Sequence, residues 1–211
     1  MDSTELKILL SHLEEADERE AGLEQYRTPP RIAADLLNRV ELQENLEGKS
    51  VADLGCGEGS LALGAAVLGA ESLGIDVDGS MVEAARRNRE LLEEELGREI
   101  HAEFEKSGVR EFDGEADVVV MNPPFGMRRE DENLAFLDTA FRTSPVVYAL
   151  LHSPEENTGE TRGFVSGYAD DHGFESGVLE TYRFPLPRSF EFHGSERKHI
   201  NVDLYRFERR Q

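Results

Sequence analysis

Residues 49–59, which read KSVADLGCGEG, contain the turn that decides the fold of this chain. The first six of them have the length and apolar content of a short buried strand. Glycines at positions 55, 57 and 59 follow at once, and residues 60–68 have the composition of a helix. Because glycine lets the backbone approach a ligand closely and a helix N-terminus offers free N–H groups, this strand–turn–helix unit is typical of a ligand-binding site. It is not the dinucleotide fingerprint, since Ser60 occupies the position of the third glycine, and it lacks the Lys-Ser or Lys-Thr pair of a phosphate-binding loop.

Two later strands also end in polar residues. Residues 72–76, SLGID, end in Asp76 about 20 residues after the glycine turn, where a carboxylate can accept hydrogen bonds from both ribose hydroxyls of a nucleoside. Residues 117–121, DVVVM, run directly into Asn122-Pro123-Pro124-Phe125. Asn-Pro and Pro-Pro pairs are also common in ordinary strand-ending turns, so the tetrapeptide alone leaves open whether it is a turn or a site.

Helical and extended patterns alternate over the rest of the chain. An amphipathic helix is expected over residues 4–20, and a second begins at Pro29-Pro30, where Thr28 is placed to cap it. Further strands are expected at residues 101–106, 146–151, 174–186 and 199–207, and further helices at 81–96, around 134–141 and at 161–171. This order predicts an α/β fold with a mostly parallel sheet, helices on both faces and an antiparallel C-terminal hairpin. A single domain is expected over residues 1–211, with an N-terminal helical extension at about 1–40.

Composition sets the broad class of the protein. A length of 211 residues suits one substantial core, and no apolar stretch approaches the ~20 residues of a membrane span. The first residues lack the pattern of a signal peptide and Cys56 is the only cysteine, so a reducing, cytoplasmic location is expected. No metal site is expected, because the six histidines show no metal-ligand spacing.

The formal net charge of −21 bears on the partner, because a protein that meets nucleic acid is expected to present positive surface. Nearly all of the positive charge is arginine, and acidic residues occur along the whole chain. This pattern is typical of adaptation to a cytosol of high salt, where the screening length falls to about 3 Å at 1 M. Basic residues outnumber acidic ones from Thr181 onward, so the C-terminal end could still face phosphates. Alternatively, the acidic surface is only a solvated surface that does not indicate the partner. The charge pattern does not distinguish this interpretation from contact with phosphates.

The motifs taken together resemble a known family. The Asp-x-Gly-x-Gly-x-Gly turn, Gly-x-Asp at the end of the second strand and Asn-Pro-Pro-Phe at the end of the fourth are similar to class I methyltransferases that use S-adenosylmethionine and act on amino nitrogens. Residues 24–28, 121–126, 135–140 and 202–207 extend the likeness over almost the whole chain. With them the chain resembles the methyltransferase-like protein 5 family, adenine methyltransferases of small-subunit ribosomal RNA. The resemblance implies a Rossmann-like class I methyltransferase fold with a seven-stranded sheet, S-adenosylmethionine as cofactor and S-adenosylhomocysteine as product.

The resemblance also implies roles for residues around the glycine turn. Asp53 and the glycines would hold the amino-acid end of the cofactor, and Asp76 would hold its ribose. Many relatives bind adenine with an aspartate after the third strand, where this chain has Ser107-Gly108-Val109, so a main-chain group or the Ser107 hydroxyl would have to substitute. The local pattern leaves two roles for Tyr26: it packs as an apolar staple against the next helix, or it lines the cofactor pocket with its neighbours. The resemblance implies that it lines the pocket. The residues expected to bind the cofactor are Gln25, Tyr26, Thr28, Asp53, Gly55, Gly57, Glu58, Ser60, Asp76, Val77, Ser107, Gly108, Val109 and Asn122.

The same resemblance makes Asn122, Pro123, Pro124 and Phe125 the catalytic segment. The lone pair of an adenine amine is delocalised into the ring, so it attacks poorly unless the nitrogen is drawn toward tetrahedral geometry. The Asn122 side-chain oxygen and the Pro123 carbonyl would each accept one amine hydrogen, and positioning would supply much of the rate without a strong base. Phe125 would stack on an unpaired or flipped-out base, while Pro124 would fix the turn.

Two other functions stay open. The same fold can methylate a glutamine side chain in protein, although such enzymes usually carry tyrosine at the position of Phe125. A catalytically silent scaffold that binds RNA or a partner would also keep the fold.

A partner is implied as well, because relatives pair with a small zinc-binding activator that adds a strand to the sheet edge beside the third strand. That edge is expected at His101 to Lys106, with Ala102 and Phe104 in a hydrophobic contact. Alternatively, Glu103, Glu105 and Lys106 protect a short edge strand from pairing.

Overall fold

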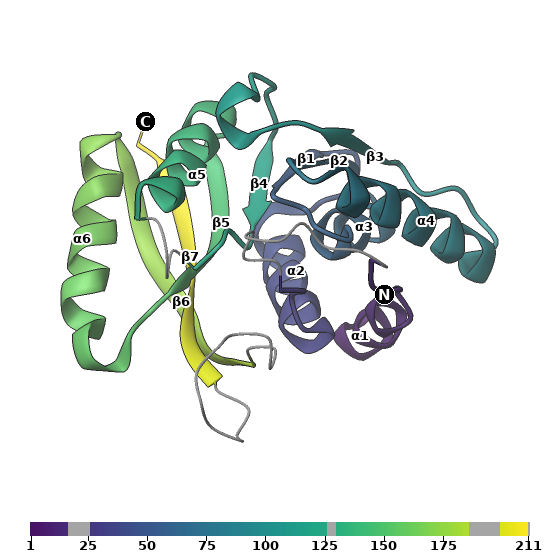
Figure 1. Ribbon diagram of the computed structural model, residues 1–211, viewed down its shortest axis with the longest axis horizontal. Helices are drawn as coiled ribbons and strands as arrows, with labels where there is room; N and C mark the ends of the chain where they lie inside the picture. Colours follow the sequence, from purple (N-terminus) through teal and green to yellow (C-terminus); the bar gives the residue numbers. More distant parts are fainter. Residues whose placement is uncertain (17–25, 126–129, 186–198, 211) are drawn as a thin grey trace.

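A seven-stranded sheet forms the centre of the protein (Figure 1). The computed structural model describes residues 1–16, 26–125, 130–185 and 199–210, without the side chains of residues 130–133. The strands lie in the order β3-β2-β1-β4-β5-β7-β6; the first five run parallel, and β7 lies antiparallel to both β5 and β6. Their bounds are β1 Ser50–Leu54, β2 Glu71–Asp76, β3 Ala102–Lys106, β4 Val118–Met121, β5 Val146–His152, β6 Phe174–Pro185 and β7 His199–Arg209. The predicted fold class and C-terminal hairpin are confirmed.

Helices cover both faces of this sheet (Figure 1). The helices α1 to α4 share one apolar cluster with one face, and α5 and α6 share a second cluster with the other face. Their bounds are α1 Ser3–Ser11, α2 Pro30–Glu44, α3 Ser60–Val67, α4 Gly79–Leu96, α5 Glu130–Thr143 and α6 Thr158–Asp171. The first two helices therefore pack into the core that covers the sheet, while the division into one domain with an N-terminal extension stays a prediction.

The apolar run of β4 shows why the central strands are hydrophobic throughout. Val118 and Val120 belong to the cluster on the α1 to α4 side, whereas Val119 and Met121 belong to the cluster on the α5 and α6 side. All four side chains are fully buried. Successive side chains of a strand point to opposite faces, so a strand covered on both sides needs apolar residues at every position.

The N-terminal segment departs from the sequence prediction in two ways. Helix α1 ends at Ser11 instead of continuing to residue 20, although Leu6, Leu9 and Leu10 form its buried face as expected. Residues 17–25, which include Gln25, lie outside the described part of the chain. Thr28 does not cap α2: the N-cap position is Pro29, without a side-chain hydrogen bond. The prediction was wrong because Pro30 lacks an N–H and the Thr28 hydroxyl bonds elsewhere, as described below.

The ends of α4 follow the prediction. The Asp78 side chain accepts a hydrogen bond from the Ser80 N–H at 2.8 Å, and Gly97 ends the helix in the left-handed conformation at φ 63°. None of the helices in the described ranges is long and apolar enough to cross a membrane. The cytoplasmic location stays a prediction.

Strand β3 lies at the sheet edge, as predicted, but its apolar side chains do not face outward. Ala102 and Phe104 are 1% and 3% exposed and pack into the cluster beneath α3 and α4, so the expected hydrophobic contact with a partner is wrong for these two residues. Their carbonyls lie on the outer edge, where Arg86 Nη2 donates to Phe104 at 2.6 Å and Arg89 Nη1 donates to Ala102 at 3.1 Å. Two arginines of α4 thus occupy backbone acceptors that an added strand would use.

Candidate active site

The candidate site lies where the parallel strands end at their carboxyl edge. Strands β1, β2, β3 and β4 end in Leu54, Asp76, Lys106 and Met121, and the chain order along the sheet reverses between β1 and β4. Open α/β sheets bind ligands at such a reversal, because the loops that leave the two strands diverge there. The predicted cofactor-binding and catalytic residues follow these four strand ends.

The glycine turn after β1 is tied to β2 and shaped by its neighbours. The N–H groups of Gly55 and Cys56 both donate to the Ile75 carbonyl at 2.9 Å. Gly59 has φ 87°, and a Cβ there would lie 3.0 Å from both Ala85 and Phe104, so only glycine fits. Gly57 also has positive φ, at 53°, but a Cβ there would meet no heavy atom within 4 Å. Gly57 is therefore the part of the turn that a bound molecule could approach.

Two buried carboxylates flank this turn. Asp53 is 1% exposed; its Oδ2 accepts from the Ala62 N–H of α3 at 3.0 Å, while its Oδ1 has no hydrogen-bond partner among the described residues. Burial raises the pKa of Asp53 to about 7, the Ala62 N–H opposes that rise, and the nearby Asp76 adds to it. Asp76 accepts one backbone N–H on each oxygen, from Gly57 and Asp78, both at 2.9 Å. Burial also raises the pKa of Asp76.

The two carboxylates fit the ligand that the resemblance implies. The free oxygen of Asp53 is a buried acceptor, which an ammonium group would satisfy, and charged partners are the usual means of keeping a buried carboxylate ionised. The Asp76 oxygens each keep a further lone pair for a hydroxyl donor. The residues present are therefore suited to an amino acid at one end and a ribose at the other.

Asn122 is held by one side of its amide only. Its Nδ2 donates to the Thr28 Oγ at 2.9 Å, and its Oδ1 has no hydrogen-bond partner within the described ranges. Thr28 is 5% exposed and comes from the segment just before α2. In this orientation the Thr28 hydroxyl accepts from the amide nitrogen, and the amide oxygen is left for a donor such as an amine.

Phe125 lies in a cluster of aromatic rings. It is 4% exposed and stacks on Tyr26, with ring centroids 4.5 Å apart and planes inclined by 16°. Phe184 of β6 packs edge-on against both rings, and the Phe125 N–H donates to the Tyr26 hydroxyl. One face of Phe125 is thus covered by Tyr26, so a base that stacks on that face has to take the place of the tyrosine ring.

The other predicted cofactor residues occupy different surroundings. Glu58 is 5% exposed and faces the N-terminal segment, because its Oε1 accepts from the Ala16 N–H at 3.1 Å. The Ser107 N–H donates to the Asp76 carbonyl at 2.9 Å, and its hydroxyl donates to the Gly108 carbonyl at 3.3 Å. The Ser107 oxygen still has capacity to accept a bond from an adenine amine. Ser60 is buried at the start of α3, Val77 is 53% exposed, and the Val109 carbonyl accepts from the Thr139 hydroxyl at 3.0 Å.

Two residues of the site were not predicted. Phe136 of α5 packs against the glycine turn, since a Cβ on Gly55 would lie 3.0 Å from its ring. His152, at the end of β5, has its ring centroid 6.2 Å from that of Phe125, and burial lowers its pKa. Phe136 lies within the stretch 135–140 that carries the family likeness, whereas sequence spacing carries no signal for His152; both contacts arise from packing between distant segments. Among the residues that the structure describes, no group of three His, Cys, Asp or Glu side chains could hold a metal ion.

The reversal of strand order, the glycine turn and the buried carboxylates define a class I methyltransferase. Residues 31–123 match the family model described as ribosomal protein L11 methyltransferase (PrmA). The rRNA N(6)-adenosine-methyltransferase Mettl5 of Drosophila melanogaster is 35% identical over 191 residues, which cover 88% of this chain and 86% of that protein. The chain belongs to the METTL5 family of rRNA N(6)-adenosine-methyltransferases.

Two solved structures share this fold. The candidate RNA methyltransferase PH1948 from Pyrococcus horikoshii is 36% identical and aligns over 98% of this chain and 96% of its own, with a TM-score of 0.83. Magnesium protoporphyrin IX methyltransferase from Synechocystis PCC 6803, solved with bound SAM, shares the fold at 19% identity and a TM-score of 0.62, over 84% of this chain and 78% of that one.

Proposed function

We propose that this protein transfers the methyl group of S-adenosylmethionine to the 6-amino group of an adenine in ribosomal RNA, and that the target lies in the small subunit. Family membership supports the adenine in ribosomal RNA. The observation that carries the chemistry is the buried Asn122 Oδ1, an acceptor without a partner in the described part of the chain. The choice of the small subunit rests on the resemblance alone.

The catalytic segment acts by positioning the amine. Asn122 Oδ1 accepts one amine hydrogen and the Pro123 carbonyl accepts the other, so the nitrogen is drawn toward tetrahedral geometry. When bound, the cofactor supplies an electrophilic methyl group on a positively charged sulfur. Oriented acceptors of this kind strengthen as the nitrogen becomes positive, so they stabilise the transition state more than the ground state.

The cofactor is proposed to lie along the ends of β1 and β2. Asp53 Oδ1 would accept from its ammonium group, the turn at Gly57 would approach its amino-acid portion, and Asp76 would accept from its ribose hydroxyls. The methyl group would then face the neighbouring end of β4, which carries Asn122.

The target base is proposed to stack on Phe125 after Tyr26 moves. Tyr26 covers this ring and lies at the edge of the undescribed residues 17–25. An adenine would replace one aromatic stacking partner of Phe125 by another, and the exchange would break the bond from the Phe125 N–H to the Tyr26 hydroxyl and the contact of Tyr26 with Phe184.

The experiment is methyl transfer from labelled S-adenosylmethionine to total RNA and to total protein. We expect label in N6-methyladenosine of small-subunit ribosomal RNA, with a kcat for Asn122→Ala about 10²- to 10³-fold lower. Asn38→Ala serves as a matched control, because among the described residues the Asn38 amide bonds only the Ala34 carbonyl of its own helix.

Two results would contradict the proposal. Label in protein alone would favour methylation of a glutamine side chain, and label undiminished in Asn122→Ala would exclude the catalytic role of this residue. Calorimetry with S-adenosylmethionine separates a silent scaffold from an enzyme, since we expect both the wild type and Asn122→Ala to bind it.

We also propose a small zinc-binding activator as a partner, which adds a strand beside β3. The support is that β3 pairs with β2 alone among the described strands. Arg86 and Arg89 would have to release the carbonyls of Phe104 and Ala102 first. Co-expression with such an activator is expected to give a 1:1 complex, and Arg86→Ala/Arg89→Ala is expected to tighten it; a monodisperse, fully active chain without any companion would contradict this proposal.

A further inference from the structure

A polar cleft of about 500 Å³ lies between α1, α2 and β6, outside the cofactor site. Helix α1 contributes Lys7 and two hydroxyl residues, α2 contributes Arg31, Asp35 and Arg39, and β6 contributes Glu180 to Tyr182. The three elements come from distant parts of the sequence, and α1 and α2 pack beside one another (Figure 1). The cleft is therefore a product of the tertiary structure, which no local motif indicates.

The acidic side chains of the cleft are already paired within it. Arg39 Nε donates to Asp35 at 3.0 Å, and its Nη2 donates to Glu180 at 3.0 Å. The Tyr182 hydroxyl also donates to Asp35. Lys7 and Arg31, in contrast, make no ion pair with any acid in the described ranges, and both are exposed. Three cations and two carboxylates leave the cleft with an excess of one positive charge.

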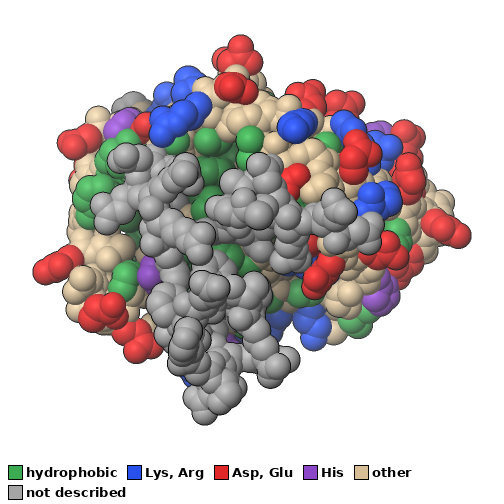
Figure 2. All heavy atoms as spheres, in the orientation of Figure 1, with side chains coloured by type: hydrophobic (Ala, Val, Ile, Leu, Met, Phe, Trp, Pro, Cys, Tyr) green, Lys and Arg blue, Asp and Glu red, His purple; other side chains and the backbone are tan. Residues whose placement is uncertain are grey.

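An excess of positive charge is unusual on this molecule. The whole chain carries a formal charge of −21, and Figure 2 shows acidic side chains spread around the face that it displays. Several other arginines lie beside carboxylates, such as Arg86 with Glu83, Arg162 with Asp203, and Arg210 with Asp170. Lys7 and Arg31, which form no ion pair in this cleft, therefore indicate that the cleft binds an anion from outside the chain.

The position of the cleft beside the proposed base-binding site indicates which kind of anion it binds. Arg31 follows Thr28, which bonds Asn122, by three residues. Tyr182 lies two residues before Phe184, whose ring packs on Phe125, so the two side chains share one face of β6. Two residues of a strand span about 7 Å, so the cleft adjoins the place where the target base is proposed to stack.

We propose that this cleft binds a backbone phosphate of the RNA strand next to the target adenine. Arg31 would contact two phosphate oxygens with its planar fork, and Lys7 would add a third, flexible donor from the opposite wall. Arg39 stays with its two carboxylates and holds the walls together. The inference rests on the proposed function for the nature of the strand, and it explains how a strongly acidic chain holds RNA at its active site.

The test measures the binding of a labelled, adenine-containing RNA oligonucleotide by anisotropy at 50 to 400 mM KCl, and in parallel its methylation. We expect Lys7→Ala/Arg31→Ala to weaken binding at least about fivefold at low salt. The slope of log K against log salt should fall in magnitude by roughly 0.7, since the cleft neutralises one phosphate and each phosphate neutralised on a single strand contributes ~0.7. The KM for RNA should rise with kcat unchanged, and the affinity for S-adenosylmethionine should stay the same.

Lys49→Ala/Arg98→Ala is the matched control, because Lys49 lies at the amino end of β1 and Arg98 follows α4. An unchanged affinity and salt slope in Lys7→Ala/Arg31→Ala, or an equal change in the control, would overturn the phosphate site while leaving RNA methylation intact. Loss of binding through these two cations without any methylation of RNA would support the site and reject the proposed activity. Circular dichroism of both double variants establishes that each remains folded.

Discussion

The bond from Asn122 to Thr28 holds the side-chain amide that we propose receives the substrate amine. An asparagine amide has a donor end and an acceptor end, and rotation by half a turn exchanges them. Thr28 receives the donor end at 2.9 Å, so the acceptor end is buried without a partner in the described part of the protein. We therefore propose that Thr28, which the sequence places in the cofactor site, positions the acceptor of the amine.

Thr28→Val is expected to lower kcat about tenfold, because the amide loses its fixed orientation and spends part of its time with the wrong end toward the amine. The KM for S-adenosylmethionine should remain unchanged. Thr28→Ser keeps the hydroxyl and should restore kcat. Steady-state kinetics on RNA measures both constants. A changed KM for the cofactor with an unchanged kcat would contradict the positioning role and show that Thr28 binds the cofactor.

The protonation of Asp53 links the site to stability. Its pKa is raised by burial from 3.8 to about 7, so between these values the native state binds a proton that the unfolded state releases. The free energy of unfolding therefore falls as pH rises through this window, by an amount on the order of 4 kcal/mol if the carboxyl stays fully buried. We expect Asp53→Asn to lose this part of the pH dependence and to exceed the wild type in stability above pH 7.

Urea unfolding of the cofactor-free protein at pH 5 and pH 8 measures this difference. Asp76, whose pKa burial also raises, is present in both proteins, and because its charge contributes to the rise at Asp53, the difference between the two proteins includes this coupling. A wild type and an Asp53→Asn variant with parallel pH dependence would contradict the assignment.

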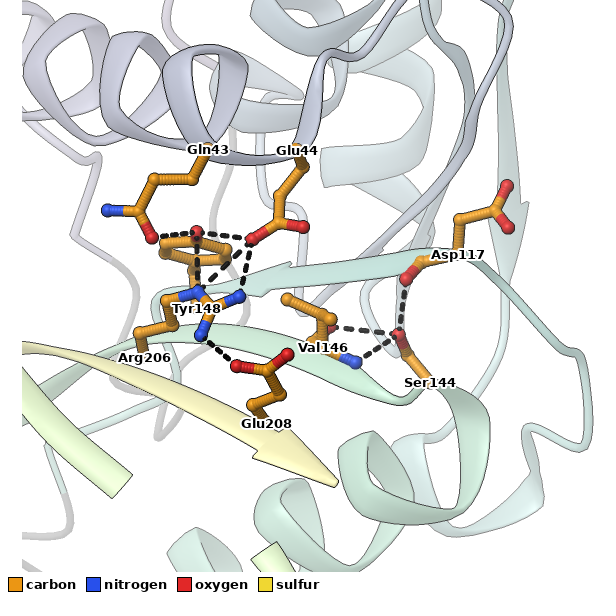
Figure 3. A network of polar contacts seen from close by, with 8 residues as sticks. All are labelled: Gln43, Glu44, Asp117, Ser144, Val146, Tyr148, Arg206 and Glu208. Carbon is orange, nitrogen blue, oxygen red and sulfur yellow. Dashed lines mark hydrogen bonds and ion pairs between the residues drawn. The ribbon is translucent and has the colours of Figure 1, made fainter. Parts of the chain in front are cut away.

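At the scale of elements, a partly buried polar network joins the C-terminal end of α2 to the sheet (Figure 3). Glu44 accepts from the Tyr148 hydroxyl of β5 at 2.8 Å and from Arg206 Nη2 of β7 at 2.9 Å. Arg206 also donates to the Tyr148 hydroxyl at 3.0 Å and to Glu208 at 2.6 Å. Helix α2 begins two residues after Thr28, which bonds Asn122. The network therefore holds in place the helix that follows this bond.

Glu44→Ala is expected to reduce the free energy of unfolding by about 1–3 kcal/mol, because it leaves the partly buried Arg206 and Tyr148 without their shared acceptor. Glu208→Ala removes the other carboxylate of the same arginine, but its side chain is 57% exposed, so it should cost less than about 1 kcal/mol. Urea denaturation of the two variants compares them directly, and equal losses would show that burial of the ion pair does not matter here.

For the whole molecule, the net charge of −21 is the dominant electrostatic feature. Figure 2 shows its acidic side chains around the face displayed, and repulsion among such charges opposes the compact state. Adaptation to high salt stays a prediction, but its physical consequence can be measured. Salt shortens the screening length from about 10 Å at 0.1 M to about 3 Å at 1 M, which removes most of the repulsion between exposed carboxylates.

We expect Tm to rise by at least ~2 °C between 0.1 and 1 M KCl, which corresponds to roughly 1 kcal/mol for a chain of this size. Three exposed residues provide a control: Glu71→Lys/Glu99→Lys/Glu103→Lys changes the net charge by +6, from −21 to −15. The increase in Tm should be smaller in this variant. Calorimetric scans that show no salt dependence, or the same dependence in both proteins, would contradict the electrostatic origin.

Much of the fold and of the chemistry could be predicted from local sequence. The seven strands, the glycine turn and the acid at the end of β2 could be predicted from short segments, because strand period, glycine conformation and capping act over a few residues. The reversal of strand order between β1 and β4 is a property of the assembled sheet. The sequence also predicted Asn122 as an acceptor. The error over the length of α1 arose because helical spacing shows which face is apolar but not where packing against α2 ceases to support the helix.

The sequence by itself determined the architecture and, through its resemblance, the family, since both are encoded in residue types at short spacing. Only the tertiary structure decided that Thr28 turns from the helix to Asn122, that Tyr26 covers Phe125, and that the apolar residues of β3 face inward. It alone also brought Lys7 and Arg31 to one cleft beside β6. These contacts join segments far apart in the chain, and the energy of such a contact depends on which groups meet in space, which no local pattern records.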